Sequence, residues 1–123
     1  MSTFKNDTII KKIGFNLNGD FADFFVSKDE SYMIIGIAEK KNKELFNFFG
    51  KLDLFISFKK EDNSWTKPIN LGKNINKFSY WSWGPYVTND HKYLIFSSWA
   101  KPVGTYIIKF DKLLKNMRSK SLK

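Results

Sequence analysis

An internal repeat limits what this chain can fold into more than any other feature. Residues 25–34 align without gaps on residues 86–95, at a constant offset of 61 residues. A second match lies upstream, where residues 13–18 correspond to residues 71–76 at an offset of 58. A chain that repeats at a fixed period builds one supersecondary unit more than once and stacks the copies. The sequence therefore predicts two similar units.

Short apolar runs bounded by turn residues predict that each unit is made of β-strands. The runs are too short for ordinary helices. The expected strands cover residues 24–27, 32–38, 52–58, 66–71, 85–88, 93–98 and 105–110. The turns at residues 28–31, 61–64 and 88–91 contain Asp or Asn, whose side chains can hydrogen-bond the local backbone. The first unit then holds four strands, and the second ends after its third.

The aromatic content supports the same fold class, since thirteen Phe, five Tyr and four Trp favour a pleated surface. We therefore expect an all-β fold. Two segments leave alternatives open. Residues 39–49 fit a helix ended by Gly50, although we favour a long loop there. Residues 111–123 fit either a basic C-terminal tail or a short helix that Asp111 would cap.

The net charge of +9 is compatible with nucleic acid or an anionic surface as a partner. The lysines are scattered, however, and accompany the Asn, Ile and Phe that A- and T-rich codons encode, so we favour composition as the source of the charge. No apolar run is long enough to span a membrane. Location stays open: the chain as written has no signal peptide and predicts the cytoplasm, whereas a longer exported form would lie in the periplasm.

Residues 85–98 resemble a known repeat. They begin with Pro85 and an aromatic residue, continue through a turn that contains Asp90, and end with Tyr93-Leu-Ile-Phe-Ser. This order is similar to the signature of WD-like β-propeller repeats, which reads Pro, aromatic, Ser-Pro-Asp-Gly, Lys-Tyr-Leu, Phe-Ser. Such repeats are found in the Tol-Pal system protein TolB. Both copies of the turn keep the Asp. Neither copy has the family's Pro and Gly: residues 88–91 read Thr-Asn-Asp-His and residues 27–30 read Ser-Lys-Asp-Glu.

The segment between the two copies extends the resemblance over residues 13–110. Residues 53–57, then Trp65 to Pro68, then Asn70-Leu71-Gly72 and Asn76 look like that family's linker between blades. The resemblance implies a partial β-propeller over residues 1–110. It would hold about two repeats, near residues 13–75 and 71–110, with four-stranded antiparallel blades in an incomplete ring. We expect Trp65 to cover a blade edge, and Gly72 to adopt a backbone angle that side chains disfavour.

The incomplete ring leaves two interpretations of assembly. Complete propellers close with roughly four to eight blades, and closure protects the strand edges. Residues 7–14 fit the outer strand of a preceding blade, so the ends of the chain are complementary. Three copies would then form a homo-oligomeric ring of six blades. The rival interpretation, which we favour, is a fragment of a longer product.

Catalytic chemistry is not predicted. His91 is the only histidine and occupies a turn, facing solvent by its pattern, and there is no cysteine. No metal site or catalytic triad follows from these residues. The acidic residues lie in expected loops, and no glycine-rich phosphate loop is present, so neither a glycosidase pair nor nucleotide hydrolysis is indicated. We expect a non-enzymatic chain without a cofactor.

The aromatic cluster just before residue 85 is the best candidate for a binding site. Exposed, these rings could stack on a sugar, a base or a partner's side chain; buried, they would pack between blades. The candidate residues are Tyr80, Trp81, Trp83, Trp99 and Lys101. We expect a binding or scaffold module for a protein or peptide; the alternatives are the propeller part of a larger hydrolase or peptidase, or a carbohydrate-binding module. A role in nucleic-acid binding is a minor alternative.

Overall fold

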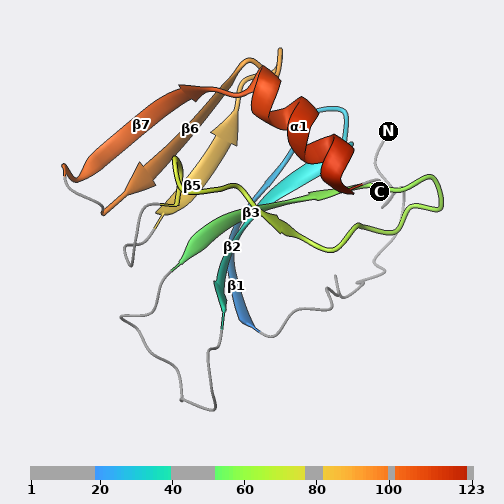
Figure 1. Cartoon of the computed structure of the whole chain (residues 1–123), viewed down its shortest axis with the longest axis horizontal. Helices are drawn as coiled ribbons and strands as arrows, with labels where there is room; N and C mark the ends of the chain where they lie inside the picture. The colour runs from blue at the N-terminus through green and yellow to red at the C-terminus, as the bar shows by residue number, and fades with distance from the viewer. Residues whose placement is uncertain (1–18, 40–51, 77–81, 100–101, 122–123) are drawn as a thin grey trace, which may run out of the picture.

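A computed structural model describes residues 19–39, 52–76, 82–99 and 102–121 of the chain. These residues form two antiparallel sheets and one helix (Figure 1). The first sheet has four strands in chain order: β1 (Gly19–Val26), β2 (Tyr32–Glu39), β3 (Asp53–Phe58) and β4 (Ile69–Asn70). The second has three strands in chain order: β5 (Ser82–Val87), β6 (Tyr93–Ser98) and β7 (Gly104–Lys109).

The predicted β fold is confirmed in its coarse form: the described residues are mostly antiparallel strands, with one helix after them. Each sheet is a simple antiparallel meander, and the second sheet has three strands, as the repeat predicted. The expected strand at residues 66–71 is shorter in the structure, where β4 is Ile69–Asn70. The finer prediction, propeller blades, stays a prediction. The helix or loop expected at residues 39–49 and the strand expected at residues 7–14 lie outside the described residues.

The C-terminal segment is a helix, α1 (Asp111–Ser121), rather than a frayed tail. An acidic residue in the first turn and basic residues in the last turn complement the helix dipole. Leu114 and Met117, three residues apart, are buried against the sheets. Burial of this apolar stripe is what stabilises so short a helix. The helix contacts β3 beside the junction of the two sheets (Figure 1).

The two sheets repeat one another down to an irregularity of the backbone. The pairing of β1 with β2 shifts register at Asp23, and the pairing of β5 with β6 shifts register between Trp83 and Tyr86. Asp23 and Gly84, which are 61 residues apart, both adopt positive φ, of 52° and 64°. A β-bulge with one residue in the left-handed region bends a strand and increases its twist. The sequence repeat is therefore also a structural repeat.

The sheets stack so that opposite faces meet. We call the side of each sheet that carries Tyr32 and Ile34, or their repeat equivalents Tyr93 and Ile95, its front face, and the other side its back face. The front face of the first sheet packs against the back face of the second. The main buried cluster joins Tyr32, Ile34, Leu54, Ile56 and Phe58 to Val87, Leu94, Phe96, Phe110, Leu114 and Met117. A smaller buried cluster lies on the back face of the first sheet: Met33, Ile35, Ile37 and Phe55.

The linker motif has a structural role, as expected. The side chain of Asn76 accepts a hydrogen bond from the amide of Leu54 at 2.7 Å and donates to the Leu54 carbonyl at 2.9 Å. It also donates to Asn70 Oδ1, which accepts from the Gly72 amide. Gly72 has φ of 98°, which side chains disfavour, so that expectation is confirmed. Trp65 packs against the smaller cluster on the back face of the first sheet.

Candidate functional site

The Asp residues of the repeated turns bind the local backbone, as the sequence predicted. Asp29 Oδ1 accepts hydrogen bonds from the Ser31 amide at 3.0 Å and from the Ser27 hydroxyl at 2.7 Å. Asp90 Oδ1 accepts from the Lys92 amide at 3.0 Å and from the Thr88 hydroxyl at 2.7 Å. Asp62 Oδ1, in the turn after β3, accepts from both the amide and the hydroxyl of Ser64. These carboxylates stabilise turns, which is the structural role expected of them.

Hydrogen bonding also sets the acidity of these groups. Burial alone would raise the pKa of Asp29, but the hydrogen bonds from Ser27 and Ser31 and the charge of His91 outweigh it and lower the pKa from 3.8 to about 2. The hydroxyl of Thr88 and the amide of Lys92 likewise lower the pKa of Asp90. Each turn carboxylate therefore stays ionised at neutral pH and is a poor general acid or base.

The expectation that His91 faces solvent is met only in part, because both ring nitrogens also face groups of the first turn. Its Nδ1 lies 2.8 Å from the hydroxyl of Tyr32, and its Nε2 lies 3.7 Å from the Asp29 carboxylate. Its side chain is 30% exposed and its ring lies beside that of Tyr32, at 5.5 Å between centroids. The turn of the second sheet therefore docks on the turn of the first. Because Tyr32 is fully buried, this contact is structural.

Two of the five candidate binding residues lie together in the structure. The rings of Trp83 and Trp99 meet edge to face, with 5.7 Å between centroids and 88° between planes. Trp83 is half-buried and Trp99 is 52% exposed, and neither belongs to a core cluster. Strand pairing brings them together, since Trp83 in β5 pairs with Ser97, two residues before Trp99. Tyr80, Trp81 and Lys101 lie outside the described residues.

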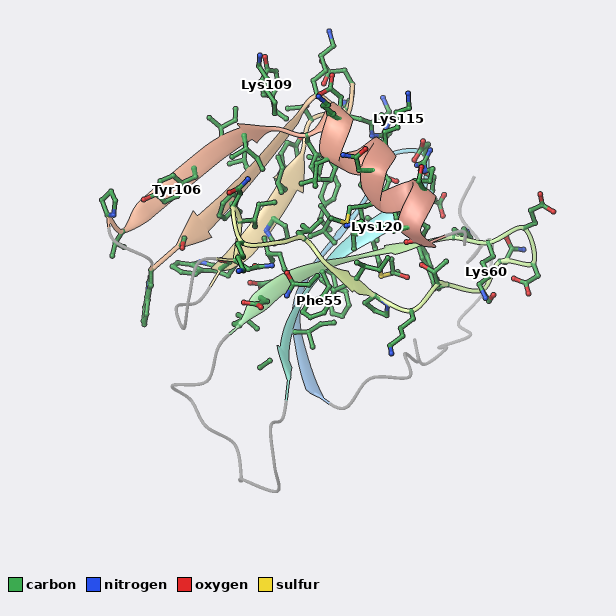
Figure 2. All side chains as sticks on the ribbon, viewed as in Figure 1. Phe55, Lys60, Tyr106, Lys109, Lys115 and Lys120 are labelled. Atoms are coloured by element: carbon green, nitrogen blue, oxygen red, sulfur yellow. The ribbon has the colours of Figure 1, made fainter. Side chains whose placement is uncertain are left out.

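Polar and apolar groups surround this pair, which we call the tryptophan site. Ser97 in β6 pairs with Trp83 on one side and with Thr105 of β7 on the other, and the hydroxyls of Ser97 and Thr105 lie 3.1 Å apart. Val103, just before β7, is 64% exposed. The site is at the end of the second sheet where β7 begins, whereas Lys109 ends β7 beside the helix; Figure 2 places Tyr106 and Lys109 toward these opposite ends. The arrangement offers an exposed indole face with hydroxyls beside it.

The other exposed apolar residues on the front face of the second sheet were not predicted from the sequence. Tyr86 is 49% exposed, Tyr93 38% and Ile107 61%. Tyr86 and Ile107 both pair with Ile95, so they lie in one row across the three strands. The signal was present as adjacent Ile107 and Ile108, because consecutive strand residues point to opposite faces. Two apolar faces predict a sheet that is covered on both sides.

Catalytic and metal-binding arrangements are not found in the part of the chain that the structure describes. No three His, Asp or Glu side chains lie close enough there to hold a metal ion. The carboxylate of Asp23, at the bulge in β1, accepts a hydrogen bond from the Gly84 amide of β5 at 3.1 Å. Among the described helices, none is long and apolar enough to cross a membrane.

Comparisons with known proteins give no relative. A scan against protein-family models, a search of curated proteins and a search of solved structures each found no match.

Proposed function

We propose that this chain is a non-catalytic binding module of the WD-like β-propeller type, and that its ligand is a protein or peptide bound at the tryptophan site. Two features support the propeller interpretation. Both units are antiparallel meanders with a bulge at the same repeat position, and they stack front face on back face. Radial repetition of such sheets is how propellers bury their blades.

The edge-to-face pair of Trp83 and Trp99 carries the proposed function. An exposed indole, ordered by a second ring, presents a large contact area at a small loss of conformational entropy, which is why Trp is enriched among the residues that dominate binding energy. Val103, four residues after Trp99 and just before β7, adds exposed apolar surface at the same end of the sheet. An apolar or aromatic side chain of a peptide fits this surface, and the net charge of +9 favours an acidic sequence around it.

A carbohydrate is the second candidate ligand, and one observation favours it. The hydroxyls of Ser97 and Thr105 lie beside the indole pair. Sugars bind by stacking an apolar face on an aromatic ring while their hydroxyls form hydrogen bonds, so both kinds of group would be used. The apolar Val103 argues for the peptide instead.

Selection from a displayed random-peptide library, followed by calorimetry on the selected peptides, tests the proposal. Trp99→Ala should weaken peptide binding at least tenfold, because removal of a central aromatic contact raises the dissociation constant by that much or more. Phe24→Ser is the matched control: Phe24 is 54% exposed, as Trp99 is 52%, but lies in the first sheet. It should leave binding unchanged.

Two results would overturn the assignment. One is peptide affinity that is equal in wild type and Trp99→Ala. The other is a chain that selects no peptide but binds to a glycan array, with that binding lost in Trp99→Ala. This result would establish a carbohydrate as the ligand.

A further inference from the structure

The two sheets differ in whether their third strand has a further neighbour. In the first sheet, Ile69 of β4 pairs with Ile56 of β3. The amide of Leu71, just after β4, donates to the Leu54 carbonyl at 3.0 Å. In the second sheet the chain enters α1 directly after β7, and β7 is the last strand of that sheet within the part of the chain that the structure describes (Figure 1). The second sheet therefore has an edge where the first has a fourth strand.

The hydrogen bonds of β7 show which of its backbone groups point outward. The Phe110 amide donates to the Lys92 carbonyl at 2.6 Å, so the even-numbered residues of β7 direct their amides and carbonyls toward β6. The odd-numbered residues, Thr105, Ile107 and Lys109, direct theirs away from β6. Among the described residues, no backbone group pairs with these outward amides and carbonyls. They form a row of unused donors and acceptors.

The side chains of β7 do not protect this edge. Edge strands are usually blunted by charges, Pro or a bulge. β7 reads Gly-Thr-Tyr-Ile-Ile-Lys, has no Pro, pairs with β6 without a register shift, and carries one charge, at Lys109. Ile107 is 61% exposed, whereas Ile56, at the same register position of the first sheet, is fully buried in the main cluster against which Ile69 packs. The open apolar edge is a template for another strand.

We infer that an extended peptide segment of a partner protein adds to β7 as the fourth strand of the second sheet, antiparallel as β4 is to β3. The inference rests on the proposed function, because this peptide is the ligand whose end reaches the tryptophan site. An antiparallel peptide begins beside Lys109 and ends beside Gly104, at the end of the sheet that carries Val103 and the tryptophan pair. Main-chain hydrogen bonds supply affinity, and alternate side chains supply specificity.

The first sheet indicates which peptide sequence fits. Ile69 lies opposite the β3 residue that corresponds to Ile107. Leu71 bonds the β3 residue that corresponds to Thr105, so the peptide carries Ile and Leu two residues apart. An acidic residue two positions before the Ile lies opposite Lys109, and a Trp two positions after the Leu continues on the same face toward the tryptophan site. The peptide Glu-Thr-Ile-Asn-Leu-Thr-Trp meets these conditions.

Charge favours a peptide over a second copy of the chain at this edge. An acidic residue opposite exposed Lys109 forms a cross-strand pair of opposite charge, which stabilises strand pairing. If two β7 strands paired antiparallel about Ile107, Lys109 of one copy would face Thr105 of the other and gain no such partner. Each copy also carries a net charge of +9, which opposes association.

Amide hydrogen exchange on the full chain, read residue by residue by NMR, tests the pairing with acetylated Glu-Thr-Ile-Asn-Leu-Thr-Trp as the probe. In the free chain, the amides of Thr105, Ile107 and Lys109 should exchange much faster than those of Tyr106 and Ile108, which face β6. The probe at millimolar concentration should slow exchange of the three outward amides by about tenfold or more, and change the other two far less. This alternation distinguishes an added strand from a ligand lying on the face of the sheet.

N-methylated probes give a matched control for the backbone hydrogen bonds. Antiparallel pairing directs the amides of the probe's Ile and Leu toward β7 and the amide of the Asn between them away. A methyl group on the Ile amide should raise the dissociation constant by about tenfold or more, because it removes a hydrogen bond and blocks the close approach of the strands. The same methyl group on the Asn amide should leave the dissociation constant nearly unchanged.

A charge exchange tests the register of the added strand. Lys109→Glu should weaken binding of the probe by about threefold, and replacement of the probe's Glu by Lys should restore it. Lys60→Glu changes the net charge equally but lies in the turn after β3, away from Lys109 (Figure 2), and should leave binding unchanged.

Three results would overturn the inference: outward amides of β7 that are already protected in the free chain, by its own residues or by a second copy; no slowing by the probe; or equal binding of the two methylated probes. Failure of the proposed function gives a different result. Alternating protection with affinity unchanged in Trp99→Ala supports the added strand without the tryptophan site. Selected peptides that lose affinity in Trp99→Ala but protect no outward amide support the tryptophan site alone and overturn the added strand.

Discussion

The two hairpin turns share one local structure and have different surroundings. In each, an Asp carboxylate accepts from a hydroxyl two residues before it and an amide two residues after it. In each, the next residue, Glu30 or His91, has positive φ. Yet Tyr32, which begins the strand after the first turn, is fully buried, and its equivalent Tyr93 is 38% exposed. The motif specifies the turn, and the position in the stack determines what the turn contacts.

The difference in burial gives the two hairpins different roles. The first is covered by the second sheet and the helix, so its side chains contribute stability. The second presents its equivalent side chains to solvent, where they are available for a partner. Matched substitutions at repeat-equivalent positions can therefore separate what the motif contributes from what the packing contributes.

The largest effect is expected at the two tyrosines. Tyr32→Ala should lower the free energy of unfolding by about 3–5 kcal/mol, because it removes a buried ring from the main core. Tyr93→Ala should lower it by about 0.5 kcal/mol, as for other surface changes. Urea denaturation of both variants at one protein concentration measures the difference. Equal losses would show that the motif, rather than the packing, makes Tyr important here.

Tyr32→Phe separates the ring from its hydroxyl in the same assay. It should lose about 1 kcal/mol, the usual net contribution of a hydrogen bond, since only the contact with His91 Nδ1 is removed. Tyr93→Phe is its matched control and should leave the unfolding midpoint unchanged. A loss for Tyr32→Phe as large as that for Tyr32→Ala would place the stabilising effect in the hydroxyl.

The turn carboxylates should show a smaller contrast. Asp29→Ala should lower stability by about 2 kcal/mol and Asp90→Ala by about 1 kcal/mol, because each hydrogen bond contributes roughly 0.5–1.5 kcal/mol. Asp29 accepts three hydrogen bonds, from Ser27 and from the amide and hydroxyl of Ser31, and also faces His91. Chemical denaturation measures both, and Asn89→Ala, an exposed change in the second turn, is the control. A reversed order would contradict the assignment of these contacts.

Acid should reveal the first turn in a further, smaller way. The pKa of Asp29 is lowered to about 2 in the folded chain, against about 3.9 in an unfolded one. The unfolded state therefore binds the proton first, so this contribution is full above about pH 4 and is lost as the pH falls toward 2. Solvent screening limits its size, since the carboxylate is largely exposed.

Urea midpoints measured between pH 5 and pH 2 check this expectation. Wild type should lose stability more steeply than Asp29→Asn, which cannot ionise at that position. Parallel curves for the two proteins would mean that Asp29 does not titrate differently in the folded and unfolded states.

The strands and turns were predictable because their causes are local. The apolar runs and the Asp of each turn are in the sequence, and β2, β3 and β6 begin within a residue of the expected positions. The faces were not predictable, since the two copies of the motif are alike and only the stacking makes one of them buried. The contact of His91 with Tyr32 joins residues that are 59 apart, and nothing in the turn sequence indicates it.

The candidate site was predictable in part for the same reason. Aromatic composition pointed to Trp83 and Trp99, but their contact depends on the register of β5 and β6, including the shift between Trp83 and Tyr86. A bulge inserts one residue and moves the following side chains to the other face. Without its position, the sequence could not show which aromatic residues share a face.

The smallest effect is expected at the residues with positive φ that follow the two Asp residues. A left-handed conformation costs an ordinary residue about 1–2 kcal/mol, and glycine avoids this but loses about 0.5–1 kcal/mol more in backbone entropy. Glu30→Gly should therefore gain about 0.5 kcal/mol. His91→Gly should gain nothing or lose stability, because it also removes the partner of the Tyr32 hydroxyl.

Thermal denaturation of both variants, at a concentration where the chain is monomeric, measures the contrast. Asn63→Gly, at φ of 69° in the third turn, should behave like Glu30→Gly. A gain for His91→Gly as large as for Glu30→Gly would show that the contact between the two turns contributes nothing to stability, and would leave the buried ring of Tyr32 as the whole difference between the hairpins.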